Sequence, residues 1–287
     1  QEHRRVWKGA TVLAGLMVTM ACALSLGRAE WVQLHDTWRY VGPYDNLHAL
    51  ALAMALVIAM STTVWADRSW PATSRVLAVG VAVAATVALA ASATRSGVLF
   101  VAVFLVAWGL MAGRWRWAVA SVLAVAVAVV AIPPLRYRST ELLFAVFGVA
   151  PEAGWEWLGT GRVAIWTRSW EAFHQLDVAD RWLGRGLAGY ETFWKGKEPH
   201  SEYLALYYQF GVAGPLLFLF TGLATIARAF RRRAERDMPV VGAVLVAVMV
   251  TSAVGSTLLV RMPLSWAFWA AVGAVWSATH PVRTDSA

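Results

Sequence analysis

A histidine at the start of a long apolar segment is the clearest candidate for acid–base chemistry. The sequence there reads Pro199-His200-Ser201-Glu202-Tyr203. Serine is a common first residue of a helix, so His200 is expected at the positive end of a helix dipole, which disfavours the protonated imidazole. A neutral imidazole can act as a general base toward a hydroxyl group. The carboxylates of Glu198 and Glu202 favour the protonated form, and a histidine that only packs there is the alternative interpretation.

Two arginines are candidates for binding an anionic group. Arg95 lies in Ser92-Ala93-Thr94-Arg95-Ser96-Gly97, at a tight connection between two apolar runs, and Arg162 follows Gly159-Thr160-Gly161. A planar guanidinium binds two phosphate oxygens at once and stabilises negative charge that develops on them. The simpler interpretations are a side chain that reaches the lipid headgroups for Arg95 and a solvated surface charge for Arg162.

A glycine-bearing stretch precedes the histidine and reads Leu183-Gly184-Arg185-Gly186-Leu187-Ala188-Gly189-Tyr190. It superficially resembles a phosphate-binding loop, but no Lys-Ser/Thr pair follows it, and the sequence predicts no parallel sheet to hold it. We therefore interpret it as a tight loop. Arg185 in this loop and Tyr203 after the histidine are secondary candidates for the same site.

Motifs for metal binding are absent from the sequence. The segments that carry these candidates contain no HExxH and no two histidines at i, i+4. The single cysteine, Cys22, excludes an intrachain disulfide and a cysteine-based metal site. We expect chemistry without a metal or another cofactor.

The composition predicts that membrane helices position these residues. Hydrophobic residues make up 59% of the 287 residues and charged residues only 15%, whereas a soluble domain has about 45–50% and about 25%. In such a chain we interpret the net charge of +8 as a signal for orientation in the membrane. We expect no nucleic-acid partner. The predicted fold class is therefore all-α, a polytopic transmembrane bundle.

Eight apolar runs approach the roughly 20 residues that cross a bilayer. They are about 9–27, 47–65, 76–94, 97–113, 117–135, 202–227, 239–257 and 263–279. With these spans, one side of the membrane carries 13 Lys and Arg residues and the other carries 4, apart from the long segment 136–199. The positive-inside rule then predicts cytoplasmic termini and an outward segment 136–199. The arginines between 228 and 236 are interpreted as an orientation signal that also binds anionic lipid.

The outward segment is predicted to contain an amphipathic helix. Val163, Trp166, Trp170 and Phe173 recur at helical spacing after the Gly159–Gly161 turn, with charged residues between them. We expect this helix to lie on the outer leaflet or on the bundle. The predicted organisation is five spans in 1–135, the outward loop in 136–199 and three spans in 200–287.

Four segments of the sequence occur in a characteristic order. They are Gly42-Pro43-Tyr44-Asp45-Asn46, the Ser-x-x-Arg-Ser-Gly connection at Arg95, Gly161-Arg162 followed by Trp166, and Gly184-x-Gly186 leading to His200-Ser201-x-Tyr203-Leu204 with Gly211 and Gly214. Over about residues 40–220 this combination resembles the bacterial O-antigen ligase and polysaccharide polymerase superfamily. Ser201 departs from that family, which usually has Asn after the histidine. The resemblance implies a helical bundle like that of GT-C glycosyltransferases, with about four further spans before this chain.

The resemblance also implies an activity, a metal-independent and inverting glycan transfer at the periplasmic face of the inner membrane. The donor would be a glycan on a polyprenyl pyrophosphate. The acceptor would be a hydroxyl of lipid A core for a ligase, or of a growing glycan for a polymerase. In this interpretation Arg95 and Arg162 bind the pyrophosphate and His200 removes the acceptor proton.

A non-catalytic membrane carrier of anionic lipids or solutes is the alternative from another functional class. It would use the same arginines for binding. A carrier typically has polar or broken helices at the membrane midplane, whereas the runs here are mostly Ala, Val and Leu. The sequence therefore favours chemistry at the membrane surface.

Overall fold

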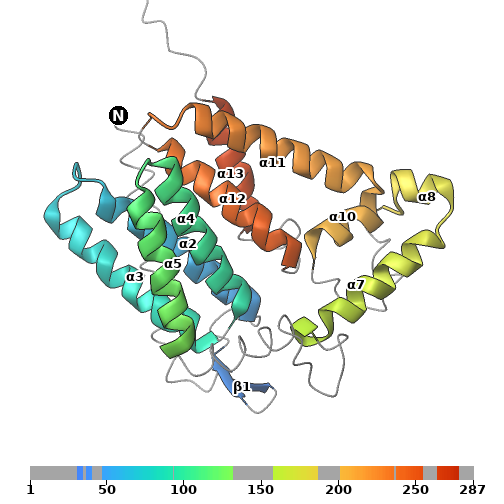
Figure 1. The fold of residues 1–287 in the computed structure, drawn as a ribbon, viewed down its shortest axis with the longest axis horizontal. Helices are drawn as coiled ribbons and strands as arrows, with labels where there is room; N and C mark the ends of the chain where they lie inside the picture. The colour runs from blue at the N-terminus through green and yellow to red at the C-terminus, as the bar shows by residue number, and fades with distance from the viewer. Residues whose placement is uncertain are drawn as a thin grey trace, which may run out of the picture. The chain divides into compact units, whose positions relative to one another are not determined.

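The computed structural model describes residues 31–34, 37–40, 47–92, 94–131, 158–186, 201–235, 237–254 and 264–277 (Figure 1). The chain forms two compact units, one of residues 1–105 and 119–139 and the other of residues 106–118 and 140–287. The predicted span 9–27, His200, and segments 132–157 and 187–200 lie outside the described residues. Helices dominate the described residues, which confirms the helical fold class.

The first unit contains a short hairpin and apolar helices. Strands β1 (Trp31–Leu34) and β2 (Thr37–Tyr40) pair antiparallel, with Trp31 opposite Tyr40, and β2 lies next to α3. The helices are α2 (Leu47–Ala66), α3 (Ala72–Ser92), α4 (Arg95–Met111) and α5 (Trp115–Ala131), and the last two cross between the units. The hairpin was not predicted, because strands of four residues are too short for a period-two pattern to stand out.

Helices α2 and α3 lie side by side in Figure 1 and form the core of the first unit. The connection between them is set by Asp67, whose side chain accepts hydrogen bonds from the backbone N–H and the hydroxyl of Ser69. Their contact faces combine alanines with larger side chains such as Leu50, Met54 and Leu89. The small alanines allow the two helices to approach closely, which is how membrane helices associate in the absence of a hydrophobic driving force.

The second unit contains α7 (Leu158–His174), α8 (Val178–Leu183), α10 (Glu202–Phe210), α11 (Ala213–Arg231), α12 (Met238–Val254) and α13 (Leu264–Ser277). Helix α12 packs against α10, α11 and α13, and it is therefore buried along most of its length. Gly222 of α11 allows the close approach of Met249, since a Cβ there would lie 2.5 Å from the sulfur. This packing fixes α10 relative to the long helices.

Among the described residues, the two helices α3 and α11 are long and apolar enough to cross a membrane. Apolar side chains on the outer sides of these two are exposed, among them Val83, Val87, Leu217 and Phe220. Trp65, Trp115 and Trp117 at helix ends are also exposed, as expected for rings at a membrane interface. The count of eight spans stays a prediction.

Two predicted boundaries were wrong. The single span 202–227 is divided at Gly211 and Val212 into α10 and α11, because Gly211 takes a left-handed conformation (φ 60°) that ends α10. Helix α7 starts at Leu158 and includes the glycines that were predicted to precede it. Glycine is tolerated in a first turn, whose N–H groups have no partner within the helix in any case.

Candidate functional site

Arg95 is the first residue of α4, in the two-residue connection from α3. The connection is polar but buried: Ser92, Thr94 and Ser96 are each at most 5% exposed, and Arg95 itself is half-buried. The Ser92 hydroxyl donates to the Leu89 carbonyl, and the Thr94 hydroxyl donates to the Ser92 carbonyl. A guanidinium at a helix N-terminus adds its charge to the positive end of the dipole, so this end of α4 favours an anion.

Gly97 explains the glycine of the Ser-x-x-Arg-Ser-Gly segment. A Cβ at this position would lie 2.9 Å from the Ala51 Cβ and 3.0 Å from the Ala51 carbonyl oxygen. The first turn of α4 therefore packs directly on the backbone of α2. This contact fixes the position of Arg95, two residues earlier.

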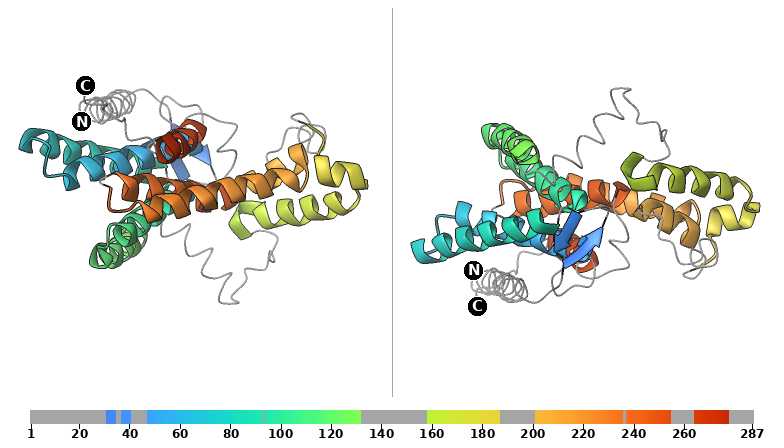
Figure 2. Two further views of the ribbon diagram at one scale, coloured as in Figure 1. Left: turned by 90° about the horizontal axis from the view of Figure 1, so that it is seen from above. Right: turned by 90° about the horizontal axis from the view of Figure 1, so that it is seen from below.

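Helices α7, α8 and α10 form a small assembly at the N-terminal end of α11 (Figure 2). Phe173, Leu176 and Tyr208 make its core. The Tyr207 ring packs against the Phe173 ring, with 3.8 Å between the two ring centroids. The buried Tyr208 hydroxyl donates to the Ser169 carbonyl. The predicted helix is present as α7, but its predicted apolar face holds only in part: Ser169 and Phe173 are buried, whereas Trp170 is 58% exposed.

In the glycine-bearing loop, the backbone lies very close to the backbone at the C-terminal end of α10. Gly184 (φ 75°) and Gly211 (φ 60°) both adopt the left-handed conformation. A Cβ on Gly184 would lie 2.4 Å from the Gln209 carbonyl, and one on Gly211 would lie 2.3 Å from the Trp182 carbonyl. The Arg185 N–H donates to the Tyr208 carbonyl (3.0 Å) and the Gly186 N–H to the Gln209 carbonyl (2.9 Å). The loop therefore connects α8 to the C-terminal end of α10.

The arginines of this assembly have structural partners. Arg185 forms an ion pair with Asp180, with 2.6 Å between Nε and Oδ2. Arg181, which the sequence analysis did not single out, donates to the carbonyls of His174 and Leu176 and closes the turn between α7 and α8. The ion pair with Asp180 argues against Arg185 as a direct ligand of an anionic group.

Residues on the C-terminal side of His200 are described, although His200 is not. Ser201 occupies the N-cap position of α10 in an extended conformation, and its carbonyl accepts from the Ala205 N–H. Its side chain makes no capping hydrogen bond, so the predicted cap holds only for the backbone. Glu202 follows and is fully buried at 0% exposure, which sequence reasoning did not predict. The start of α10 therefore places a buried carboxylate two residues after His200.

Tyr203 contributes to packing. Its hydroxyl donates to the Met249 carbonyl of α12 at 3.1 Å, and its ring contacts Phe218 edge-on. Burial raises the pKa of the Tyr203 phenol in α10, a helix too short to cross the membrane, so the group stays protonated. Tyr203 thus ties the start of α10 to α12.

Arg162 lies in the first half of α7, one turn before Trp166, in the same unit as α10. Arg95 belongs to the other unit. The roles of Arg95, Arg162 and His200 therefore stay predictions.

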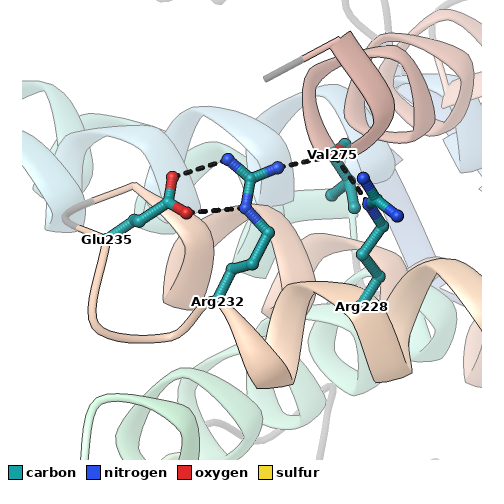
Figure 3. Close-up of polar contacts among 4 residues, drawn as sticks. All are labelled: Arg228, Arg232, Glu235 and Val275. Atoms are coloured by element: carbon teal, nitrogen blue, oxygen red, sulfur yellow. Dashed lines mark hydrogen bonds and ion pairs between the residues drawn. The ribbon is translucent and has the colours of Figure 1, made fainter. Parts of the chain in front are cut away.

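Two arginines at the C-terminal end of α11, Arg228 and Arg232, contact the end of α13 (Figure 3). Arg232 makes two hydrogen bonds to Glu235, 2.6 and 2.7 Å long, and a third of 2.8 Å to the Val275 carbonyl. The hydrogen bonds to Glu235 raise the pKa of Arg232. Arg228 lies over the Trp276 ring, 4.5 Å from its centroid, and also reaches the Val275 carbonyl. Both arginines thus cap the C-terminal end of α13.

No cluster of three or more His, Cys, Asp or Glu side chains suited to a metal occurs within the described ranges. The polar groups described near α4 and α10 are hydroxyls, arginines and one buried carboxylate.

Residues 80–219, about half of the chain, match a family model described as O-antigen ligase. This segment is similar to the O-antigen ligase family. The match includes Arg95, Arg162, the glycine loop and His200, and it confirms the resemblance drawn from the sequence. Comparisons with curated proteins and with solved structures gave no match.

The O-antigen ligase family gives the site its general chemistry. Its members are membrane-integral glycosyltransferase-like enzymes that act on polyprenyl-linked glycans and lipid acceptors. The family glycines of this chain have structural reasons: Gly97 packs on α2, Gly184 and Gly211 pack on each other's backbone neighbours, and a Cβ on Gly214 would lie 2.6 Å from the Leu206 carbonyl. The family segments therefore position backbones as well as side chains.

Proposed function

We propose that the protein transfers a glycan from polyprenyl pyrophosphate to an acceptor hydroxyl at the periplasmic face of the inner membrane. The acceptor that we favour is lipid A core, which makes the protein an O-antigen ligase. A polymerase of the same superfamily, with a growing glycan as acceptor, is the alternative. The observation that carries the proposal is Arg95 at the N-terminus of α4, inside the family match and in a buried polar connection.

The proposed reaction is a single displacement without a metal. The acceptor oxygen bonds to the anomeric carbon while the bond from that carbon to the pyrophosphate oxygen breaks, so the configuration inverts. Arg95 and Arg162 stabilise the negative charge that develops on the departing polyprenyl pyrophosphate. His200 accepts the proton of the attacking hydroxyl.

The environment of Arg95 supports its role. A cation in the first turn of a helix is unfavourable by about 0.3–1 kcal/mol, because the dipole has the same sign there. A bound pyrophosphate reverses this term, since it interacts favourably with both the guanidinium and the helix end. The packing of Gly97 on α2 holds this arrangement in place.

A carrier function is the competing proposal, and the break between α10 and α11 bears on it. Broken helices occur at the midplane of carriers. Here the break at Gly211 precedes a helix of 19 residues, about 28 Å long, which alone nearly spans the roughly 30 Å hydrocarbon core. The break thus lies at one end of a spanning helix, which favours a site at the surface.

The test of the histidine measures transfer and donor binding on the same purified protein, with a lipid-linked glycan as donor. We expect His200→Ala to retain donor binding and to lose transfer by roughly 10²–10⁴-fold, because only proton removal is affected. The rate of the unmodified protein should also fall as the pH drops through the pKa of an imidazole. Parallel loss of binding and transfer would assign His200 to the donor site and contradict the proposed base.

The test of the arginines uses charge-conserving variants. Arg95→Lys and Arg162→Lys each lose the planar donor pair, and we expect transfer to fall at least about tenfold, or ~1.4 kcal/mol. Arg168→Lys, at an exposed position of α7, is the matched control and should keep full activity. Full activity of both site variants would show that these arginines do not bind the pyrophosphate.

A further inference from the structure

Helix α8 (Val178–Leu183) exposes its apolar side chains although it lies in a packed assembly. Val178, Trp182 and Leu183 are 69, 59 and 75% exposed, and the first two are four residues apart on one helical face. A group of exposed apolar side chains that lie close together is typical of an interaction site.

The backbone joins α8 directly to the start of the spanning helix α11. The Val212 N–H donates to the Arg181 carbonyl at 2.9 Å, and Gly211 lies against the Trp182 carbonyl. Phe210, at the end of α10, is 41% exposed at this junction. Leu216, Leu217 and Phe220 continue the exposed apolar side chains along α11, with exposures of 55, 65 and 73%.

We infer that α8 is a membrane-surface anchor that inserts Val178, Trp182 and Leu183 into the phospholipids at the N-terminal end of α11. The apolar side of α11 faces lipid in a membrane-integral protein, and α8 is attached where that helix begins. Tryptophan is enriched at this depth, because its ring is amphipathic. The anchor holds the assembly of α7, α8 and α10 at a fixed depth. This inference does not depend on the proposed transfer reaction.

The polar groups of α8 argue against a glycan as the partner of the exposed tryptophan. Asp177 accepts from the Asp180 N–H and caps the helix, Asp180 pairs with Arg185, and Arg181 binds the carbonyls of the preceding turn. A glycan-binding surface needs hydrogen-bonding side chains around its aromatic ring. The most exposed side chains that flank Trp182 within α8, Val178 and Leu183, are instead aliphatic.

The depth of α8 is measurable with spin labels on the full chain in phospholipid nanodiscs. Cysteine is introduced in a Cys22→Ser background at Val178, Trp182 or Leu183, and in the control at Arg168, an exposed polar position of α7. The readout is the collision rate of each nitroxide with oxygen, which concentrates in lipid, and with a water-soluble nickel chelate. We expect labels at the three α8 positions to collide at least threefold more with oxygen, relative to the chelate, than the label at 168.

Two results would overturn the inference. Equal collision ratios at α8 and at residue 168 would place α8 in water. Protection of the labels at 178 and 183, in variants that keep Trp182, from the chelate only after addition of a soluble acceptor glycan would identify a glycan-binding surface. Since all labelled positions are exposed, each variant is expected to fold, and three positions on one helix make the result independent of any single substitution.

Discussion

The close approach between the glycine loop and α10 predicts different effects for two neighbouring glycines. Gly184 and Gly186 both have a positive φ, of 75° and 77°. A Cβ on Gly184 would lie 2.4 Å from backbone atoms of Gln209 and Phe210, whereas a Cβ on Gly186 meets nothing within 4 Å. Alanine substitution at the two positions therefore separates conformational strain from the backbone contact.

The expected destabilisation follows from these contacts. Forcing alanine to a positive φ costs about 1–3 kcal/mol, and this is the whole expected effect of Gly186→Ala. Gly184→Ala also pushes the loop away from α10 and breaks the hydrogen bonds to the Tyr208 and Gln209 carbonyls, each worth about 0.5–1.5 kcal/mol. We expect Gly184→Ala to be less stable than Gly186→Ala by about 1–3 kcal/mol.

The assay is thermal unfolding of both variants in the same detergent, together with glycan transfer. The difference corresponds to a Tm lower by about 2–12 °C for Gly184→Ala. Gly211→Ala should resemble Gly184→Ala, and the double variant should lose less than the sum of the two, because both disrupt one contact. Equal Tm values for Gly184→Ala and Gly186→Ala would refute the close approach.

Further predictions concern the packing of α4 on α2, the hydrogen bond between α10 and α7, the cap of α13 and the metal requirement. Gly97→Ala should destabilise the protein by about 1–3 kcal/mol through overpacking against α2, whereas Gly80→Ala, with open space around it, should not lower the Tm. Tyr208→Phe removes a buried hydrogen bond to an α7 carbonyl and should lower the unfolding free energy by about 1 kcal/mol. Arg232→Lys should lower the Tm, because an ammonium cannot keep the paired hydrogen bonds to Glu235 together with the bond to α13; an unchanged Tm would contradict the cap. Transfer should persist in excess EDTA, and a loss restored by magnesium or manganese would contradict the arginine mechanism.

Helix positions were predictable from the sequence, because apolar runs end at recognisable residues. Arg95 and Trp115 begin α4 and α5 within two residues of the predicted starts. The division at Gly211 was not predictable with the same rules, since one glycine in an apolar run is compatible with a continuous helix. Its effect depends on the contact with Trp182, which comes from a helix about thirty residues earlier in the chain.

The candidate site was predictable only in its residue types. The order of Arg95, Arg162 and His200 indicated the family, and the family match confirms that indication. The partners of the supporting residues were not predicted: Arg185 folds back from beyond the end of α8 to pair with Asp180, and Tyr203 reaches Met249, 46 residues away. The full burial of Glu202 likewise depends on packing around α10, which no local pattern encodes.

The structural arginines show which feature of Arg95 distinguishes it. Arg181, Arg228 and Arg232 all donate to carbonyl groups at the ends of helices or in turns, where the backbone offers negative partial charge. Arginine at such a position stabilises the fold without any substrate. Arg95 occupies the opposite end of a helix, where the backbone offers N–H groups and the guanidinium gains nothing from the dipole. We therefore expect an anion bound at this helix end to interact favourably with both the helix dipole and the guanidinium, as in the pyrophosphate-binding role proposed for Arg95.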